Sequence, residues 1–190
     1  MFMKKSVPVV LLLGLVLSFS ALRASAVPVL SLQPSSQVVQ PGQSFSLDVD
    51  ISNAAELFSF QFDLAFDPNV LSATSITEGP FLPSGGSTFF IPGTIDNSGG
   101  TITTTDDSLI GAISGVTGNG TLATVSFQAF ALGTSPITLS NVILLDSNLA
   151  DITSNTVDGT VTVVPEPATW LLLATGCTGL VAYGWRRRMA

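Results

Sequence analysis

The sequence predicts an all-β fold, an antiparallel β-sandwich, between two terminal export signals. Apolar and polar residues alternate with a period of two through several segments. Turn-forming pairs rich in Gly, Pro, Asn and Asp separate these segments. Many short strands with such turns favour a sandwich over a helical or mixed fold.

The N-terminus has the three parts of a secretory signal peptide. Lys4 and Lys5 precede an apolar run from Val7 to Phe19, and the small residues Ala24 and Ala26 follow. The run is shorter than the roughly 20 apolar residues that a membrane span prefers. We therefore predict a signal peptide over residues 1–26, which signal peptidase cleaves after Ala26. A short uncleaved anchor is the alternative.

The middle of the chain, residues 27–164, contains no Lys, Arg or His. All its charged side chains are acidic, and the whole chain has a net charge of -7. Burial and hydrogen bonds must stabilise this segment, because it cannot form internal ion pairs. An acidic surface repels nucleic acid and anionic lipid and attracts cations or a basic partner. The one cysteine, Cys177, lies in the C-terminal segment, so the middle segment has no disulfide.

Two strands are predicted with their faces assigned. In residues 45–51, Phe45, Leu47, Val49 and Ile51 alternate with polar residues that include Asp48 and Asp50. In residues 58–66, alternate apolar residues, mostly Phe, predict a second strand with a Phe-lined inner face. Further strands are predicted at 29–32, 37–39, 70–76, 88–95, 100–105, 122–129, 137–139, 142–145 and 160–163. We find no internal repeat, so residues 27–164 are predicted to form one domain.

Three segments of this domain resemble a cohesin domain. They are Pro41-Gly42-Gln43-Ser44-Phe45, the run from Phe60 through Asp67-Pro68-Asn69 to Leu71, and the run from Gly118-Asn119-Gly120 to Phe127. The resemblance implies a nine-stranded jelly-roll sandwich, related to carbohydrate-binding modules, that binds calcium-loaded dockerin domains in cellulose-degrading assemblies. Phe66 stands where the family often has Tyr. Glu56-Leu57-Phe58-Ser59 precedes the second segment, where the family more commonly has small residues that include Gly. From this resemblance we infer the fold of the domain, and not the identity of its partner.

Catalysis is not expected. A Ser or Thr nucleophile would lack its usual base, because the chain has no His and the domain has no Lys. Asp48 and Asp50 would lie roughly 6.6–7 Å apart on one strand face. That face is the polar one, and a solvated carboxylate is a poor general acid at neutral pH. We therefore predict that the protein is not an enzyme.

Calcium is the one metal that the sequence brings into consideration. Asp146, Asn148 and Asp151 place three oxygen-bearing side chains in one loop. Calcium takes six to eight oxygen ligands, and this loop lacks the Gly and the distal Glu of an EF-hand. The alternative is an Asx-type turn between strands. We predict no cofactor and keep calcium open.

Sugar binding usually needs an exposed aromatic platform, and the domain has no Trp and no Tyr. Most of its Phe residues alternate into the predicted core. Phe81, Phe89, Phe90 and Phe130 are the possible exceptions, and they would form either an apolar contact patch or further core packing.

The C-terminal segment, residues 165–190, has three ordered parts. Pro165-Glu166-Pro167 precedes an uncharged apolar run over 168–185, and Arg186, Arg187 and Arg188 follow. As a helix this run would rise about 27 Å, enough for a thin bilayer. Trp170 and Trp185 would lie at the two interfaces, and the arginines would act as a cytoplasmic membrane stop. We therefore expect one transmembrane helix in the inner membrane before processing.

The same three parts, with Val164 before them, resemble the bacterial PEP-CTERM sorting signal. The resemblance implies processing by an exosortase near the Pro-Glu-Pro, in a Gram-negative bacterium that makes exopolysaccharide. The protein would then reach the cell envelope or the extracellular matrix. The alternative is an ordinary tail anchor in which Pro-Glu-Pro is a rigid spacer.

Together these features predict a non-catalytic exported binding module. Its partner would be an extracellular protein, dockerin-like, or an exopolysaccharide, and not nucleic acid. The alternative function is a lectin-like module that binds exopolysaccharide directly.

Overall fold

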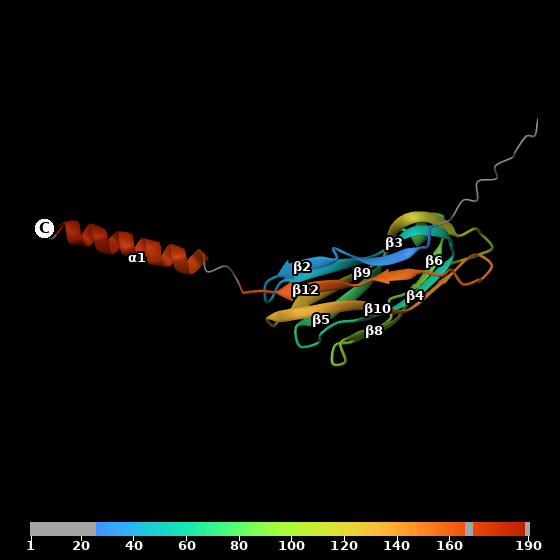
Figure 1. Cartoon of the computed structure of the whole chain (residues 1–190), viewed down its shortest axis with the longest axis horizontal. Coiled ribbons are helices and arrows are strands. Elements are labelled where there is room, and N and C mark those ends of the chain that lie inside the picture. The colour runs from blue at the N-terminus through green and yellow to red at the C-terminus, as the bar shows by residue number, and fades with distance from the viewer. Residues whose placement is uncertain (1–25, 166–168, 189–190) are drawn as a thin grey trace, which may run out of the picture.

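The computed structural model describes residues 26–165 and 169–188 (Figure 1). Within these ranges, twelve strands form two sheets, and one α-helix follows the last strand. Ala26 is described and exposed. The rest of the expected signal peptide, including Ala24, lies outside the described residues, as do Glu166 and Pro167.

The first sheet has five strands in the order β11-β1-β3-β9-β5. Their bounds are β11 (Asn155–Val157), β1 (Val29–Gln33), β3 (Ser44–Leu57), β9 (Val116–Ala129) and β5 (Leu71–Glu78). The pairs are antiparallel except β1 with β11, which is parallel. The predicted apolar face of β3 is confirmed, since Leu47, Val49 and Ile51 are buried.

The second sheet has seven strands, in the order β2-β12-β10-β4-β8-β6, and β7 also pairs with β8. Their bounds are β2 (Ser36–Val39), β12 (Gly159–Val163), β10 (Gly133–Leu145), β4 (Ser59–Ala65), β8 (Thr101–Leu109), β6 (Thr88–Ile91) and β7 (Thr94–Asp96). Only β2 with β12 is parallel. The expected all-β sandwich is therefore confirmed.

Two of the places where the chain passes from one sheet to the other lie close together. Pro34 and Ser35 separate β1 from β2, and Asp158 separates β11 from β12. The amide of Thr160 donates to the carbonyl of Ser35 at 2.9 Å, which joins the two crossings. β1 pairs with β11 in the first sheet, and their continuations β2 and β12 pair in the second sheet. These four strands therefore connect the two sheets along one edge.

Phe side chains from both sheets fill the core. Phe60 and Phe62 in β4 stack with ring centroids 6.0 Å apart, and Phe45 stacks on Phe127 at 5.6 Å. Phe66 meets Phe127 edge to face at 5.4 Å. Each fully buried Phe stabilises the fold by about 1.5–3 kcal/mol relative to an exposed one.

Two strand predictions need correction. The run at 88–95 forms two strands, β6 and β7, because Pro92 and Gly93 interrupt it and Gly93 has φ +79°. The runs at 137–139 and 142–145 form the single strand β10. A β-bulge at Asn141, with φ 49°, joins them and explains the apparent break in alternation. β11 and the 3₁₀ helix η1 (Leu82–Gly85) were not predicted.

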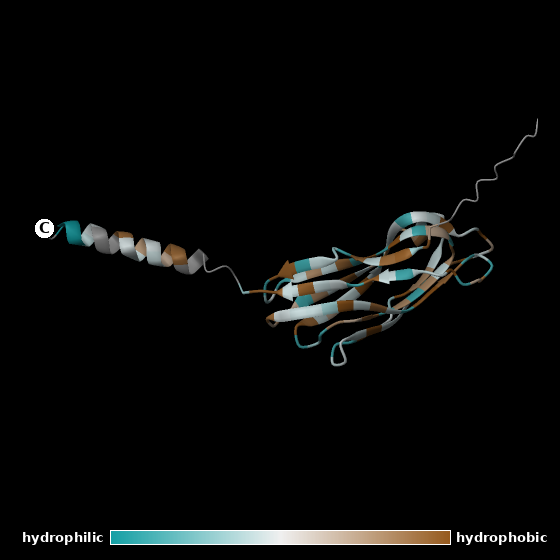
Figure 2. Cartoon of the chain, viewed as in Figure 1, coloured by the Kyte–Doolittle hydropathy of each residue, from teal (hydrophilic) through white to brown (hydrophobic). Residues whose placement is uncertain are grey.

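The helix α1 (Thr169–Arg188) confirms the predicted C-terminal helix. Residues 172–180 and 184–188 are exposed, and Figure 2 shows the teal of Arg186–Arg188 at its far end. Among the described residues, no helix combines the length and apolarity that crossing a membrane requires. The crossing of the inner membrane by this segment stays a prediction.

Candidate functional site

The outer face of the five-stranded sheet is occupied by hydrogen bonds between β3 and β9. Thr124 Oγ1 donates to Asp48 Oδ1 at 2.6 Å, and Thr121 Oγ1 donates to Asp50 Oδ1 at 2.7 Å. In the described residues of β3, β9 and β5, no large hydrophobic side chain is exposed. The two aspartates therefore stabilise the sheet surface, as their place on the polar face of the predicted strand implies.

The outer face of the seven-stranded sheet is different, because apolar side chains flank a polar centre. The strand registers place side chains in two rows across β10, β4, β8 and β6. We call these eight residues the four-strand face: Ile143, Gln61, Asp106 and Ile91 in one row, and Leu145, Ser59, Ser108 and Phe89 in the other. At the usual strand spacing, each row is about 14 Å across.

Exposure identifies the four-strand face as a candidate contact surface. Phe89 is 61% exposed, and Ile91 and Ile143 are also exposed. The polar residues between them, such as Gln61 and Asp106, are half-buried. Burial raises the pKa of the Asp106 carboxyl. Exposed apolar groups around fixed hydrogen-bonding groups are a common arrangement for macromolecular recognition.

Asp63 fixes the shape of this surface. It lies in β4, two residues after Gln61, and accepts a hydrogen bond from the Thr104 amide at 2.7 Å and another from Asn141 Nδ2 at 2.5 Å. Thr104 and Asn141 both have positive φ, 60° and 49°, and lie at register shifts in β8 and β10. One carboxylate therefore holds a bulge on each side of β4.

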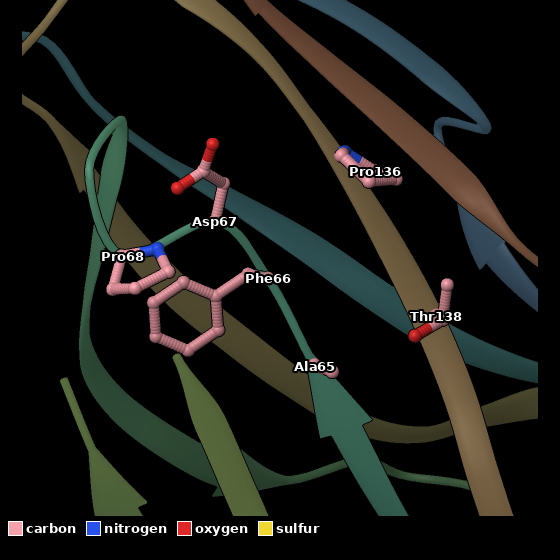
Figure 3. Close-up of a pocket in the computed structure, with 6 residues that line it drawn as sticks. All are labelled: Ala65, Phe66, Asp67, Pro68, Pro136 and Thr138. Atoms are coloured by element: carbon pink, nitrogen blue, oxygen red, sulfur yellow. The ribbon is translucent and has the colours of Figure 1, made fainter. Parts of the chain in front are cut away.

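A cleft of about 380 Å³ opens at the end of the same sheet surface (Figure 3). Its lining residues are Ala65, Phe66, Asp67, Pro68, Pro136 and Thr138. The cleft continues the surface of β4 and β10, because Ala65 is paired with Thr138. Asp67 is held there by its amide, which donates to Ser135 Oγ at 2.8 Å.

A second cleft, of about 360 Å³, lies beside β10 near the other end. Val142, Ile143, Leu144, Asp151, Ile152 and Thr153 line it. Ile143 belongs to both this cleft and the four-strand face.

The calcium candidates lie in the loop after β10. Asp146 Oδ1 accepts the amides of Asn148 at 2.8 Å and Ala150 at 2.9 Å, which is an Asx-type turn. The hydrogen bond from Ala150 lowers the pKa of Asp146. The Asp151 side chain is exposed, at an isolated bridge opposite Leu145. In the described part of the chain, no three His, Cys, Asp or Glu side chains are grouped to hold a metal ion.

The four candidate Phe residues separate into two kinds. Phe81 is buried and Phe90 packs against the core, whereas Phe89 and Phe130 are exposed. Only Phe89 lies on the four-strand face. Ile91, Ile143, Gln61 and Asp106 were not predicted as contact residues. The alternation in Thr88–Ile91 was the available signal, since it places Phe89 and Ile91 on one side.

The expected sorting residues are only partly described. Pro165 is exposed, and Arg186, Arg187 and Arg188 are exposed at the end of α1.

Comparison with protein families gives two matches on this chain. A model of the cohesin domain matches residues 30–163, and a model of the PEP-CTERM protein-sorting motif matches residues 163–188. A curated relative, cellulose-binding protein A of Clostridium cellulovorans, is 28% identical over 150 residues. That match covers 77% of this chain but only 8% of the relative's length.

Solved cohesin structures share the fold. A non-cellulosomal cohesin from the archaeon Archaeoglobus fulgidus superposes with a TM-score of 0.61 at 19% identity, covering 76% of this chain and 96% of that one. A chain of a type I cohesin–dockerin complex from Clostridium thermocellum gives a TM-score of 0.59 at 16% identity, covering 73% and 100%. At these identities the likeness concerns the fold alone.

Proposed function

The chain belongs to the cohesin domain family and carries a PEP-CTERM sorting motif, and from this we propose that it is a non-catalytic exported module that binds another protein through its four-strand face. The observation that carries the proposal is the exposure of Phe89, Ile91 and Ile143 around Gln61 and Asp106. The opposite sheet has its polar groups bonded to one another and offers less for a partner.

The chemistry of the face indicates the kind of partner. Phe89 and the two isoleucines would fill apolar pockets, while Gln61, Ser59 and Ser108 would exchange hydrogen bonds. The domain carries only acidic charges, so the partner is basic or brings a cation with it. A calcium-loaded dockerin-like domain meets this description. One of the solved cohesin structures similar to this chain is a complex with a dockerin.

The terminal segments would direct the export of the domain to the place where it meets that partner. We infer that residues 1–26 are a signal peptide cleaved after Ala26, that residues 27–164 are the binding domain, and that an exosortase processes the chain near Pro165-Glu166-Pro167. Processing at the inner membrane of a Gram-negative bacterium would then place the domain in the cell envelope or extracellular matrix. The PEP-CTERM match supports export and sorting to the envelope.

A second candidate function is direct binding of exopolysaccharide. The name of the curated relative, cellulose-binding protein A, favours it. Phe89, which lies opposite Ser108 and diagonal to Asp106, would provide one aromatic ring with two polar neighbours. A single Phe is a small platform, and residues 27–164 contain no Trp or Tyr, so protein binding is the stronger proposal.

A binding assay with matched variants tests the proposal. The full chain in mild detergent is titrated with a panel of dockerin domains, with calcium and with chelator, and in parallel with soluble polysaccharides. Phe89→Ala should weaken protein binding at least tenfold, about 1.4 kcal/mol. Phe130→Ala removes an equally large exposed ring outside the face and should leave affinity unchanged. Polysaccharide binding that depends on Phe89, without dockerin binding, would favour the second function.

A further inference from the structure

Asp107 is a fully buried carboxylate without a hydrogen-bond partner. It lies in β8 with its side chain directed inward, and it is 0% exposed. Among the described residues, neither of its carboxylate oxygens makes a hydrogen bond of ordinary geometry. A buried carboxylate in this position is destabilising while it is charged, unless a proton or a cation compensates the charge.

No basic group can provide that compensation. Residues 27–164 contain no Lys, Arg or His. Across the sheet, Asp107 is paired with Phe60 of β4 and Phe90 of β6, and neither titrates. The titratable groups that act on it are Glu78, at the end of β5 in the opposite sheet, and its own neighbour Asp106. All the charges around Asp107 are therefore negative.

Glu78 is held at this position by its surroundings. The next residue, Gly79, donates its amide to the carbonyl of Leu122 at 2.8 Å. A Cβ on Gly79 would lie 2.2 Å from the carbonyl oxygen of Thr121, so the end of β5 is fixed against β9. Thr88 Oγ1, in the edge strand β6, donates a short hydrogen bond to Glu78 Oε1. Glu78 therefore bridges the rim between the two sheets.

We propose that Glu78 and Asp107 share one proton at this rim, and that the proton holds the edge strand β6 against β8. With the proton present, one carboxyl group donates to the other, and the one negative charge that remains lies toward the exposed Glu78 instead of on the buried Asp107. When the proton leaves, the buried Asp107 carboxylate carries an uncompensated charge that the negative charge of Glu78 further disfavours. Burial first, and then the charge of Glu78, raises the pKa of Asp107 to about 7.

The consequence for the protein is a loosening of β6 above neutral pH. β6 pairs only with β8, and Phe90 of β6 lies directly opposite Asp107. The same strand presents Phe89 and Ile91 on its other side. Loosening of β6 should therefore weaken binding through the four-strand face at alkaline pH. This consequence rests on the proposed function. The proton-sharing itself does not depend on that function.

Proton linkage gives the direction in which folding stability changes with pH. A carboxyl group whose pKa is higher in the folded state binds more protons when folded, so folding stability falls as the pH rises from the ordinary pKa to the raised one. For Asp107 this window runs from the ordinary value of 3.8 to about 7. The chain has no His, so between about pH 5.5 and 7 ordinary side chains do not titrate. The upper part of the window therefore reports on the shared proton, and Asp106 is the other carboxyl group whose pKa is raised.

Two measurements on the full chain test the proposal. The first follows the ¹³C carboxyl signal of Asp107 with pH, and we expect a midpoint near neutrality. The second compares melting temperatures from about pH 5.5 to 8, where we expect the wild-type value to fall by about 5 °C or more. Asp107→Asn should remove the dependence and Glu78→Gln should weaken it. Asp151→Asn, which removes an exposed charge, should keep the wild-type profile.

Each outcome decides the proposal. An Asp107 midpoint near 4, or a melting temperature that is flat over this range, would overturn it even if Asp107→Asn fails to fold. Stabilisation at pH 7.5 by millimolar calcium, in the wild type and not in Glu78→Gln, would assign the site to a cation instead of a proton. If the pH dependence is found but Phe89→Ala does not affect partner binding, the proton pair stands and the proposed binding face does not.

Discussion

The carboxylate of Asp63 in β4 accepts a hydrogen bond from the side-chain amide of Asn141 in β10 at 2.5 Å. Its other oxygen accepts the backbone amide of Thr104 in β8 at 2.7 Å. Asn141 and Thr104 both have positive φ, which is unfavourable for residues with side chains. Asp63 therefore stabilises two β-bulges at once, and with them the twist of the strands that carry the four-strand face.

Replacing Asp63 by alanine should destabilise the fold by about 2 kcal/mol, because a charge-assisted acceptor for two donors is lost. Urea unfolding of the full chain measures this directly. Asp63→Asn keeps one acceptor oxygen for the Thr104 amide and should cost clearly less. Equal stability of Asp63→Ala and wild type would show that the bulges hold their shape without the carboxylate.

Gly79 should tolerate no side chain. A Cβ there would lie 2.2 Å from the carbonyl oxygen of Thr121 and 2.7 Å from the carbonyl carbon of Leu122. Both are backbone atoms of β9, which pairs with a strand on each side, so they cannot move aside without a large cost in free energy. Gly79→Ala should lower the free energy of unfolding by about 3 kcal/mol or more, or prevent folding.

Gly118→Ala is the matched control for this substitution. Gly118 has φ +131°, but a Cβ there would meet nothing within 4 Å. Only backbone strain of about 1 kcal/mol is expected. A Gly79→Ala chain as stable as Gly118→Ala would contradict the close approach of β5 and β9.

The strands with clean alternation could be predicted from the sequence. Phe45 to Ile51 and Phe60 to Leu64 keep a period of two, and the structure buries the predicted side chains. The split of 88–95 and the union of 137–145 could not be obtained in this way. Pro92-Gly93 and the bulge at Asn141 change the backbone locally, whereas a period-two pattern assumes a regular strand.

The sequence pattern did not predict the burial of Asp107, again because a bulge interrupts the strand. In β8, Ile102 is buried, and regular alternation from it would direct Asp106 inward and Asp107 outward. The bulge at Thr104 shifts the phase by one residue, so that Thr105, Asp107 and Leu109 are the buried residues. The four-strand face also depends on pairing between distant strands, which one sequence does not specify.

The sorting motif gives a prediction in cells. Replacing Pro165, Glu166 and Pro167 together by alanine should leave the chain unprocessed in the membrane fraction, because the expected exosortase recognition sequence is lost. Immunoblotting of membrane, envelope and medium fractions measures this. Thr156→Ala changes an exposed residue outside the matched motif and should be processed normally. Normal release of the triple variant would contradict the assignment.

The central claim is that the outer surface of β10, β4, β8 and β6 binds the partner. Hydrogen–deuterium exchange of the full chain, with and without a bound dockerin domain, tests it most directly. We predict slower exchange in peptides that contain residues 59–65, 88–91, 101–109 and 133–145, with little change in 44–57. Protection confined to β3 and β9, with the seven-stranded sheet unchanged, would contradict it.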